Sequence, residues 1–249
     1  MKVSYSSVLV GVLVQTIFTS GYETFELLSC KYDDLDCYVK FQQGIIDTFW
    51  NGNDELQVPI LDPLRIKNVT LTQRGNGVVN FDLKFKDCDF IGYRDSKVVS
   101  VSGWPRDFDG TTAELEMRAP RFTLIGPYVI KGRLLALDIQ GSGISNVTLK
   151  NVMAKMKFKL KSETRNGLEY AKVDKLKLDI HTSRTIFHFE DLFDGDKQLN
   201  EYGNLFINEN WQLVFDYIKS STLKTFEKIW QDILNHILSK LPYRSIFID

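Results

Sequence analysis

The chain has 249 residues, of which 43% are hydrophobic and 25% charged, the ordinary balance of a globular protein. Lysine and arginine total 31 against 32 acidic residues, so the formal net charge is −1. Nucleic-acid-binding proteins usually have a clear basic excess, and this balance argues against that class.

The first residues have the layout of a cleavable signal peptide. Lys2 supplies a positive start, an apolar run covers residues 8–18, and small residues follow at 19–21. The run is shorter than the roughly 20 apolar residues that a membrane-spanning helix needs. We therefore expect residues 1–21 to be a signal peptide. Residues 22–249 are expected to form one secreted, extracellular domain without stable membrane insertion.

Cysteine usage fits an oxidising compartment. Cys30 and Cys37 follow the expected cleavage site closely, and such a pair usually closes a small disulfide loop; two free thiols are the alternative. Cys88 is left over, and a buried, inert thiol is favoured over pairing with another chain. Sequons begin at Asn68 and Asn146, which we expect to be N-glycan acceptors, although such triplets also arise by chance.

The first predicted element is a short amphipathic helix over residues 36–50. Its apolar side chains recur at four-residue spacing, at Phe41, Ile45 and Phe49. Asp36 is the expected N-cap, and Gly52 is the expected stop.

From residue 60 to about residue 180 the hydrophobic period changes to two, which is typical of strands with one dry and one wet face. The alternation is clearest in residues 79–86, 154–161 and 176–180. Asn-Gly dipeptides at Asn76 and Asn166 favour two-residue hairpin turns. The second hairpin has expected arms of about ten residues, near the upper end of usual strand length. Arms that long predict a strongly curved sheet, because a flat one would leave its apolar face uncovered.

The final predicted element is a helix over residues 209–241, which contain no proline or glycine and would span about 50 Å. Asn208 is the expected N-cap, and Pro242 follows the end. Apolar residues recur every three or four positions, and Thr222 fills the one gap in their line. Only one other helix is predicted, so the curved sheet is the available partner. We expect a single α+β domain in which the sheet wraps this helix.

Motifs for catalysis are not found. Three histidines lack metal-ligand or catalytic spacing: His181, His188 and His236. Ser142 lies in a Gly-Ser-Gly triplet, which is not the nucleophile elbow of hydrolases. The acidic cluster around Gly195 lacks the spacing of an EF-hand and is interpreted as a solvated turn. The lysine ladder of residues 155–161 is interpreted as the wet face of a strand, with contact to anionic lipid or glycan as the alternative. We expect no enzyme activity, no metal and no cofactor.

Three segments resemble the insect takeout and haemolymph juvenile hormone binding protein family. Residues 58–64 read VPILDPL and look like the family's IPxLDPL hallmark. Residues 126–143 resemble its GxYxxxGxxxxLPIxGxG segment, and residues 189–211 resemble its FNNLFxG…L…N…NW segment. Ile246-Phe247 matches the family's ending, so that the resemblance covers essentially the whole mature chain.

The resemblance implies a long helix wrapped by a highly curved antiparallel sheet, as in the tubular lipid-binding superfamily, and a tunnel for a hydrophobic ligand. It also implies a disulfide between Cys30 and Cys37. Asp138 stands in place of the usual proline, and Glu190-Asp191 replaces an asparagine pair. The second disulfide of the hormone carriers cannot form. These departures indicate the broader takeout-like branch, whose members are linked to feeding, chemosensation and circadian output.

We therefore expect a monomeric carrier of a small apolar ligand, such as a juvenile-hormone-like terpenoid, a fatty acid or a related lipid. Plain core packing explains each candidate ligand-binding residue equally well; the candidates are Trp50, Phe81, Phe85, Phe122, Leu124, Trp211, Phe215 and Ile218. The alternative is an extracellular signalling or interaction protein whose pocket is vestigial or filled.

Overall fold

The computed structural model describes residues 30–32, 34–54, 57–74, 79–134 and 137–248, so the expected signal peptide lies outside the described residues. The elements in chain order are β1 (Cys30–Lys31), α1 (Leu35–Phe49), β2 (Leu64–Ile66), β3 (Val69–Gln73), β4 (Val79–Phe85), β5 (Cys88–Ile91), β6 (Lys97–Ser102), β7 (Thr112–Leu134), β8 (Leu137–Arg165), β9 (Leu168–His181), β10 (Arg184–Phe189), α2 (Lys197–Glu209), α3 (Trp211–Leu238), η1 (Tyr243–Ile246) and β11 (Phe247–Ile248).

Two very long strands, β7 and β8, form the spine of one antiparallel sheet. The first part of β8 pairs with β10 and its second part with β9, while β7 pairs in turn with β6, β5 and β4. The turn between β8 and β9 is the predicted Asn166-Gly167 hairpin, with positive φ at both residues, as such a turn requires. The other predicted hairpin turn falls on residues that the structure does not describe, but β3 and β4 beside it pair antiparallel.

The spine changes its inward face at one step in the middle. Pro120 of β7 and Asn151 of β8 lie opposite each other between the pairs Ala119–Val152 and Arg121–Lys150. Proline has no N–H to donate, and Asn151 has a positive φ of 48°. The buried residues on either side are Ala119 and Phe122 on β7, and Leu149 and Val152 on β8, with Leu149 partly buried. Both halves thus keep an apolar face inward although the strict alternation slips by one residue.

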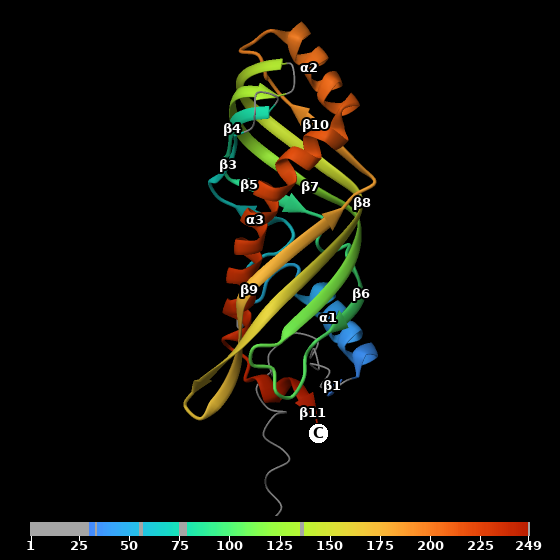
Figure 1. Ribbon diagram of the computed structural model, residues 1–249, viewed down its shortest axis with the longest axis vertical. Helices are drawn as coiled ribbons and strands as arrows, with labels where there is room; N and C mark the ends of the chain where they lie inside the picture. The colour runs from blue at the N-terminus through green and yellow to red at the C-terminus, as the bar shows by residue number, and fades with distance from the viewer. Residues whose placement is uncertain (1–29, 33, 55–56, 75–78, 135–136, 249) are drawn as a thin grey trace, which may run out of the picture.

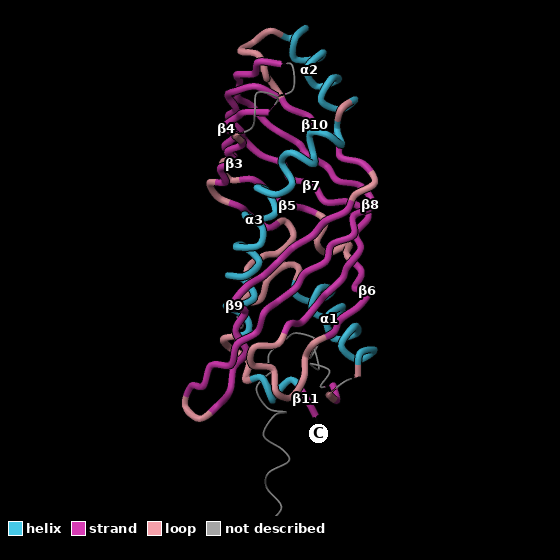
Figure 2. The backbone as a smooth tube through the Cα atoms, in the orientation of Figure 1, coloured by secondary structure: helices cyan, strands magenta, loops and turns pink. Residues whose placement is uncertain are grey.

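The last helix, α3, closes the open side of this curved sheet. It contacts β9 and β10 at one edge of the sheet and β3 at the other. Figures 1 and 2 show α3 running along an elongated molecule while the long strands cross it obliquely. The predicted α+β architecture, a long terminal helix packed in a curved antiparallel sheet, is confirmed. The helix has 28 residues, about 42 Å at the standard rise, and is shorter than expected.

The ends of the helices differ from the predictions. α1 begins one residue earlier than expected, and its N-cap is Asp34, whose carboxylate accepts from the Cys37 N–H at 3.0 Å; the prediction of Asp36 was wrong. Residues 197–209 form a separate helix, α2, that was not predicted. Asp196 caps its start. The predicted cap of the final helix, Asn208, lies inside α2. The boundary between α2 and α3 is Asn210 instead.

Amide side chains of α2 and α3 occupy the free edges of β10 and β9. Asn208 accepts from the Phe187 N–H at 2.9 Å and donates to its C=O at 2.6 Å. Asn204 makes the same pair of bonds with Phe189, each at 2.8 Å. Asn235 of α3 does so on β9. Asn204 and Asn208, four residues apart on the helix, therefore face Phe189 and Phe187, two residues apart on the strand. The amide side chains pair with the strand edge as a neighbouring strand would.

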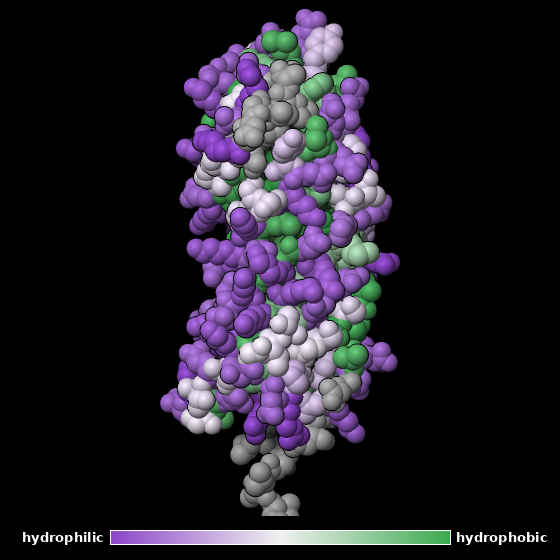
Figure 3. Space-filling view, in the orientation of Figure 1, coloured by the Kyte–Doolittle hydropathy of each residue, from purple (hydrophilic) through white to green (hydrophobic). Residues whose placement is uncertain are grey.

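Figure 3 shows one face of the molecule, on which hydrophilic residues predominate. None of the helices in the described residues combines the length and the apolar character needed to cross a membrane.

Candidate functional site

Two cavities lie between α3 and the sheet. The first follows residues 215–230 of α3 and contains about 880 Å³ of space between protein atoms, part of it open to solvent. The second follows residues 230–241 and contains about 1190 Å³, also partly open. Both are lined mainly by aliphatic and aromatic side chains. Their walls therefore suit the apolar part of a ligand.

Strand register builds the sheet wall of the first cavity in rows. Leu124 of β7 lies between Phe90 of β5 and Val147 of β8, and Val147 in turn pairs with Phe187 of β10. All four side chains line the cavity. The adjacent row of lining residues comes from β7, β8 and β10: Phe122, Leu149 and Thr185. Because residues two apart on a strand share a face, the two rows form one continuous wall.

Four residues line both cavities and mark where they meet: Tyr93, Met117, Met156 and Trp230. The rings of Tyr93 and Trp230 lie 5.0 Å apart between centroids. Burial raises the pKa of the Tyr93 phenol above its usual value, so this side chain is uncharged at neutral pH. The junction is therefore an aromatic pair from a loop and a helix, flanked by two flexible methionines.

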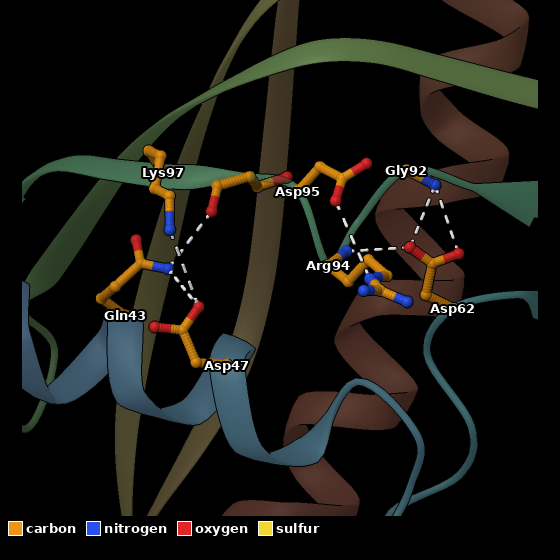
Figure 4. Close-up of polar contacts among 8 residues, drawn as sticks. Gln43, Asp47, Asp62, Gly92, Arg94, Asp95 and Lys97 are labelled. Carbon is orange, nitrogen blue, oxygen red and sulfur yellow. Dashed lines mark hydrogen bonds and ion pairs between the residues drawn. The ribbon is translucent and has the colours of Figure 1, made fainter.

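The loop that carries Tyr93 is held by the segment that contains the LDPL motif (Figure 4). Asp62 is buried and its carboxylate accepts from the backbone N–H of Gly92 at 3.1 Å and of Arg94 at 2.9 Å. From the other side, Gln43 of α1 accepts from the Val98 N–H at 2.9 Å. These bonds fix the backbone on both sides of Tyr93 and thereby place its ring at the junction.

Charge reaches the first cavity at one point on its rim. Lys219 of α3 is one of the lining residues, and its Nζ lies 2.7 Å from Oδ1 of Asp179 on β9. This hydrogen bond lowers the pKa of the Asp179 carboxyl, so the pair is a neutralised ion pair at neutral pH. Two further lining residues carry a hydroxyl group, Thr185 and Thr222.

Half of the candidate ligand-binding residues line the first cavity. They are Phe122 and Leu124 of β7 and Phe215 and Ile218 of α3. The structure thus brings together two pairs from elements about 90 residues apart in sequence. Their role in binding remains a prediction.

The other four candidates line neither of these two cavities. Phe81 and Phe85 are almost fully buried in the core beside α3, and Trp211 packs against the same core. Trp50 lies under the Arg94 guanidinium, 4.5 Å from its ring centroid. Phe81 and Phe85 thus face inward, as their spacing predicts, but they pack in the core, and Trp50 and Trp211 are only partly buried.

Sequence reasoning did not select the junction residues. Met156 and Trp230 belong to the alternating strand and to the apolar line of the helix, so a signal for their inward position was present. Tyr93 lies in a loop, where periodicity carries no information. Its position depends on Asp62, which is distant in sequence.

The Gly-Ser-Gly triplet of β8 and the acidic cluster around Gly195 have structural roles. A Cβ on Gly141 would lie 1.8 Å from the carbonyl oxygen of Asp191, so this glycine lets the chain after β10 pass over β8. Ser142 beside it is exposed. Of the acidic cluster, Asp191 accepts from the Gly195 N–H and Asp196 caps α2. Within the described ranges, no group of His, Cys, Asp or Glu is arranged to hold a metal ion.

The cysteines are placed as predicted. Cys30 and Cys37 form a disulfide with an S–S distance of 2.03 Å. Cys88 is free and fully buried, and burial raises the pKa of its thiol to about 11. Of the two predicted glycan acceptors, Asn68 is exposed before β3, whereas Asn146 is half-buried in the middle of β8.

Known proteins are similar to this chain in structure and in sequence. The crystal structure of Epiphyas postvittana Takeout 1 superposes with a TM-score of 0.79 at 22% identity, covering 89% of this chain and 100% of that one. The circadian clock-controlled protein daywake of Drosophila yakuba is 24% identical over 225 residues, and that of Drosophila melanogaster is 23% identical. Each alignment covers 89% of this chain and 86% of the relative.

The profile of one family, described as haemolymph juvenile hormone binding protein (JHBP), matches residues 8–248. The match includes the VPILDPL segment, residues 126–143 of β7 and β8, and Ile246-Phe247 at the C-terminal end. The chain therefore belongs to the haemolymph juvenile hormone binding protein family, whose members are non-enzymatic carriers of hydrophobic ligands.

Proposed function

We propose that this protein is a secreted, monomeric carrier that holds one small hydrophobic ligand in the cavities between α3 and the sheet. The observation that carries the proposal is the first cavity, whose wall consists mainly of aliphatic and aromatic side chains from six elements, β5, β7, β8, β9, β10 and α3. A terpenoid, a fatty acid or a related lipid fits this chemistry.

Secretion is part of the proposal and rests on two features. The Cys30–Cys37 disulfide persists in oxidising compartments such as the extracellular space. The leader-like residues 1–21 would direct the chain there. An apolar ligand needs a carrier in that aqueous environment, because exposing apolar surface to water is unfavourable.

The test compares ligand content and probe binding in matched variants. The secreted protein would be extracted with organic solvent for mass spectrometry, and an apolar fluorescent probe would be titrated into the delipidated protein. Leu124→Trp places a large ring in the first cavity and should abolish probe binding. Val129→Trp, on the exposed face of the same strand, should leave it unchanged. Absence of both a stoichiometric lipid and probe binding in the wild type would refute the proposal.

A second candidate function is an extracellular interaction protein with a filled pocket. The observation that favours it is a row of exposed apolar side chains along α2: Leu199, Tyr202 and Leu205, with 49%, 60% and 55% of their surface accessible. Relatives named circadian clock-controlled proteins make circadian output one form of this alternative. Specific receptor capture that is unaffected by Leu124→Trp but lost in Leu205→Lys would favour it over the carrier.

A further inference from the structure

Unpaired polar atoms are concentrated on the cavity walls. Among the buried side-chain nitrogen and oxygen atoms of the described residues, four have no hydrogen-bond partner: Ser96 Oγ, Trp104 Nε1, Thr185 Oγ1 and Thr222 Oγ1. Both threonines line the first cavity, and Trp104 lines the second. An unpaired buried hydroxyl costs about 1–3 kcal/mol, so these positions need an explanation.

Thr222 interrupts the apolar line of α3 where that line faces the first cavity. Hydroxyls in helices normally bond with a carbonyl of the preceding turn. Its neighbours do so, because Ser221 donates to the Ile218 carbonyl at 3.0 Å and Thr225 to the Ser221 carbonyl at 3.3 Å. Thr222 differs from both in having no such partner.

Thr185 interrupts the inward line of β10 in the same way. It is fully buried, and the next two inward residues of the strand are Phe187 and Phe189. It lies beside Leu149 of β8 in the row of lining residues that includes Phe122. The hydroxyl thus belongs to a wall that is otherwise hydrocarbon at this point.

Valine has the same shape as threonine and would avoid the cost of an unpaired hydroxyl at both positions. Two elements from different parts of the chain nevertheless place a threonine on one cavity. Resting on the proposed function, we propose that Thr185 and Thr222 form the polar subsite of the first cavity and hydrogen-bond to a neutral oxygen of the ligand, such as an ester, ketone or ether oxygen. The bound ligand then supplies the partner that the protein itself lacks.

The charges around the site favour a neutral oxygen over a carboxylate. Lys219 is the cationic residue on this wall, and Asp179 already neutralises it at 2.7 Å. A ligand carboxylate near Lys219 would also lie near the Asp179 carboxylate. Two hydroxyls alone do not compensate for the desolvation of a buried anion. The class of ligand is therefore an apolar chain with an uncharged acceptor oxygen.

The test uses three probes of matched length: methyl laurate, tetradecane and ionised laurate. Their affinities are measured by displacement of an apolar fluorophore from the delipidated full chain. Thr185→Val and Thr222→Val should each lower the affinity for methyl laurate by roughly three- to tenfold, which corresponds to the loss of one hydrogen bond. Neither substitution should lower the affinity for tetradecane. Wild-type protein should bind the ester more tightly than laurate at pH 7.4.

Matched controls remove a hydroxyl that does not line this cavity. Thr225→Val on α3 and Thr123→Val on β7, whose hydroxyl pairs with Thr148 instead, should leave all three affinities unchanged. Thermal unfolding of the delipidated Thr185→Val protein should occur at the same or a higher temperature than the wild type, because an unpaired hydroxyl is removed.

The inference alone is overturned by equal ester affinity in the wild type and both variants, or by a parallel loss of tetradecane affinity. Tighter binding of laurate than of methyl laurate would also overturn it. Failure of the wild type to bind the fluorophore or any probe would instead refute the carrier function, and the inference with it.

Discussion

Asn208 offers a direct measure of how much the edge of β10 depends on helix α2. Its amide is the partner of both the N–H and the C=O of Phe187, at 2.9 and 2.6 Å. Asn208→Leu conserves size but leaves both backbone groups facing an apolar side chain. An unpaired buried group costs about 1–3 kcal/mol, and the half-buried position points to the lower limit for each. We expect a loss of about 2 kcal/mol.

For a domain of this size, about 2 kcal/mol corresponds to a decrease of roughly 4–8 °C in Tm. Thermal and urea unfolding followed by circular dichroism would measure it. Glu209→Leu is the control, because it makes a similar change at the exposed neighbouring position. Asn208→Asp should lose at least as much, because its carboxylate still accepts from the Phe187 N–H but places a second acceptor oxygen against the Phe187 C=O. Faster hydrogen exchange at the Phe187 amide would locate the effect. A loss no larger than that of Glu209→Leu would refute the reasoning.

Three further predictions concern other positions. Because burial raises the pKa of Cys88 to about 11, a thiol reagent at pH 8 should label it only after unfolding; fast labelling of the folded protein would contradict this. Gly141→Ala should destabilise the fold by about 1–3 kcal/mol in urea unfolding, because its Cβ would overlap the Asp191 carbonyl; unchanged stability would disprove that packing. Glycan occupancy, measured by intact mass of Asn→Gln variants, should be higher at Asn68 than at Asn146, and the reverse order would count against the role of exposure.

The sequence contains most of the architecture because its signals are local and periodic. Alternation in residues 154–161 and the Asn166 turn predict the β8–β9 hairpin, and the apolar line of residues 211–238 predicts the helical partner of the sheet. Helix α2 escaped this reasoning, since its mean character is polar and its key residues are asparagines. Asparagine has low helix propensity. Here the amides are retained because they pair with the edge of β10.

Only half of the candidate residues line the first cavity. The sequence period indicates which side chains face inward, but not which of them border a cavity. Phe81 and Phe122 both alternate inward on long strands, yet Phe81 is packed in filled core and Phe122 borders the first cavity. Which of them meets empty space depends on the slip at Pro120 and Asn151 and on the course of α3. That information lies in pairs of distant segments rather than in the period of any one segment.

The VPILDPL segment contributes to the cavities directly, through Leu61 in the lining of the second cavity, and also indirectly. Asp62 contributes no side chain to either cavity lining, but its carboxylate holds the Gly92 and Arg94 amides on either side of Tyr93. Tyr93 in turn meets Trp230 where the two cavities join. A buried carboxylate that accepts several backbone bonds is costly to replace, because its loss leaves those donors unpaired. Besides supplying Leu61 to the second cavity, the segment therefore supports the junction of the two cavities.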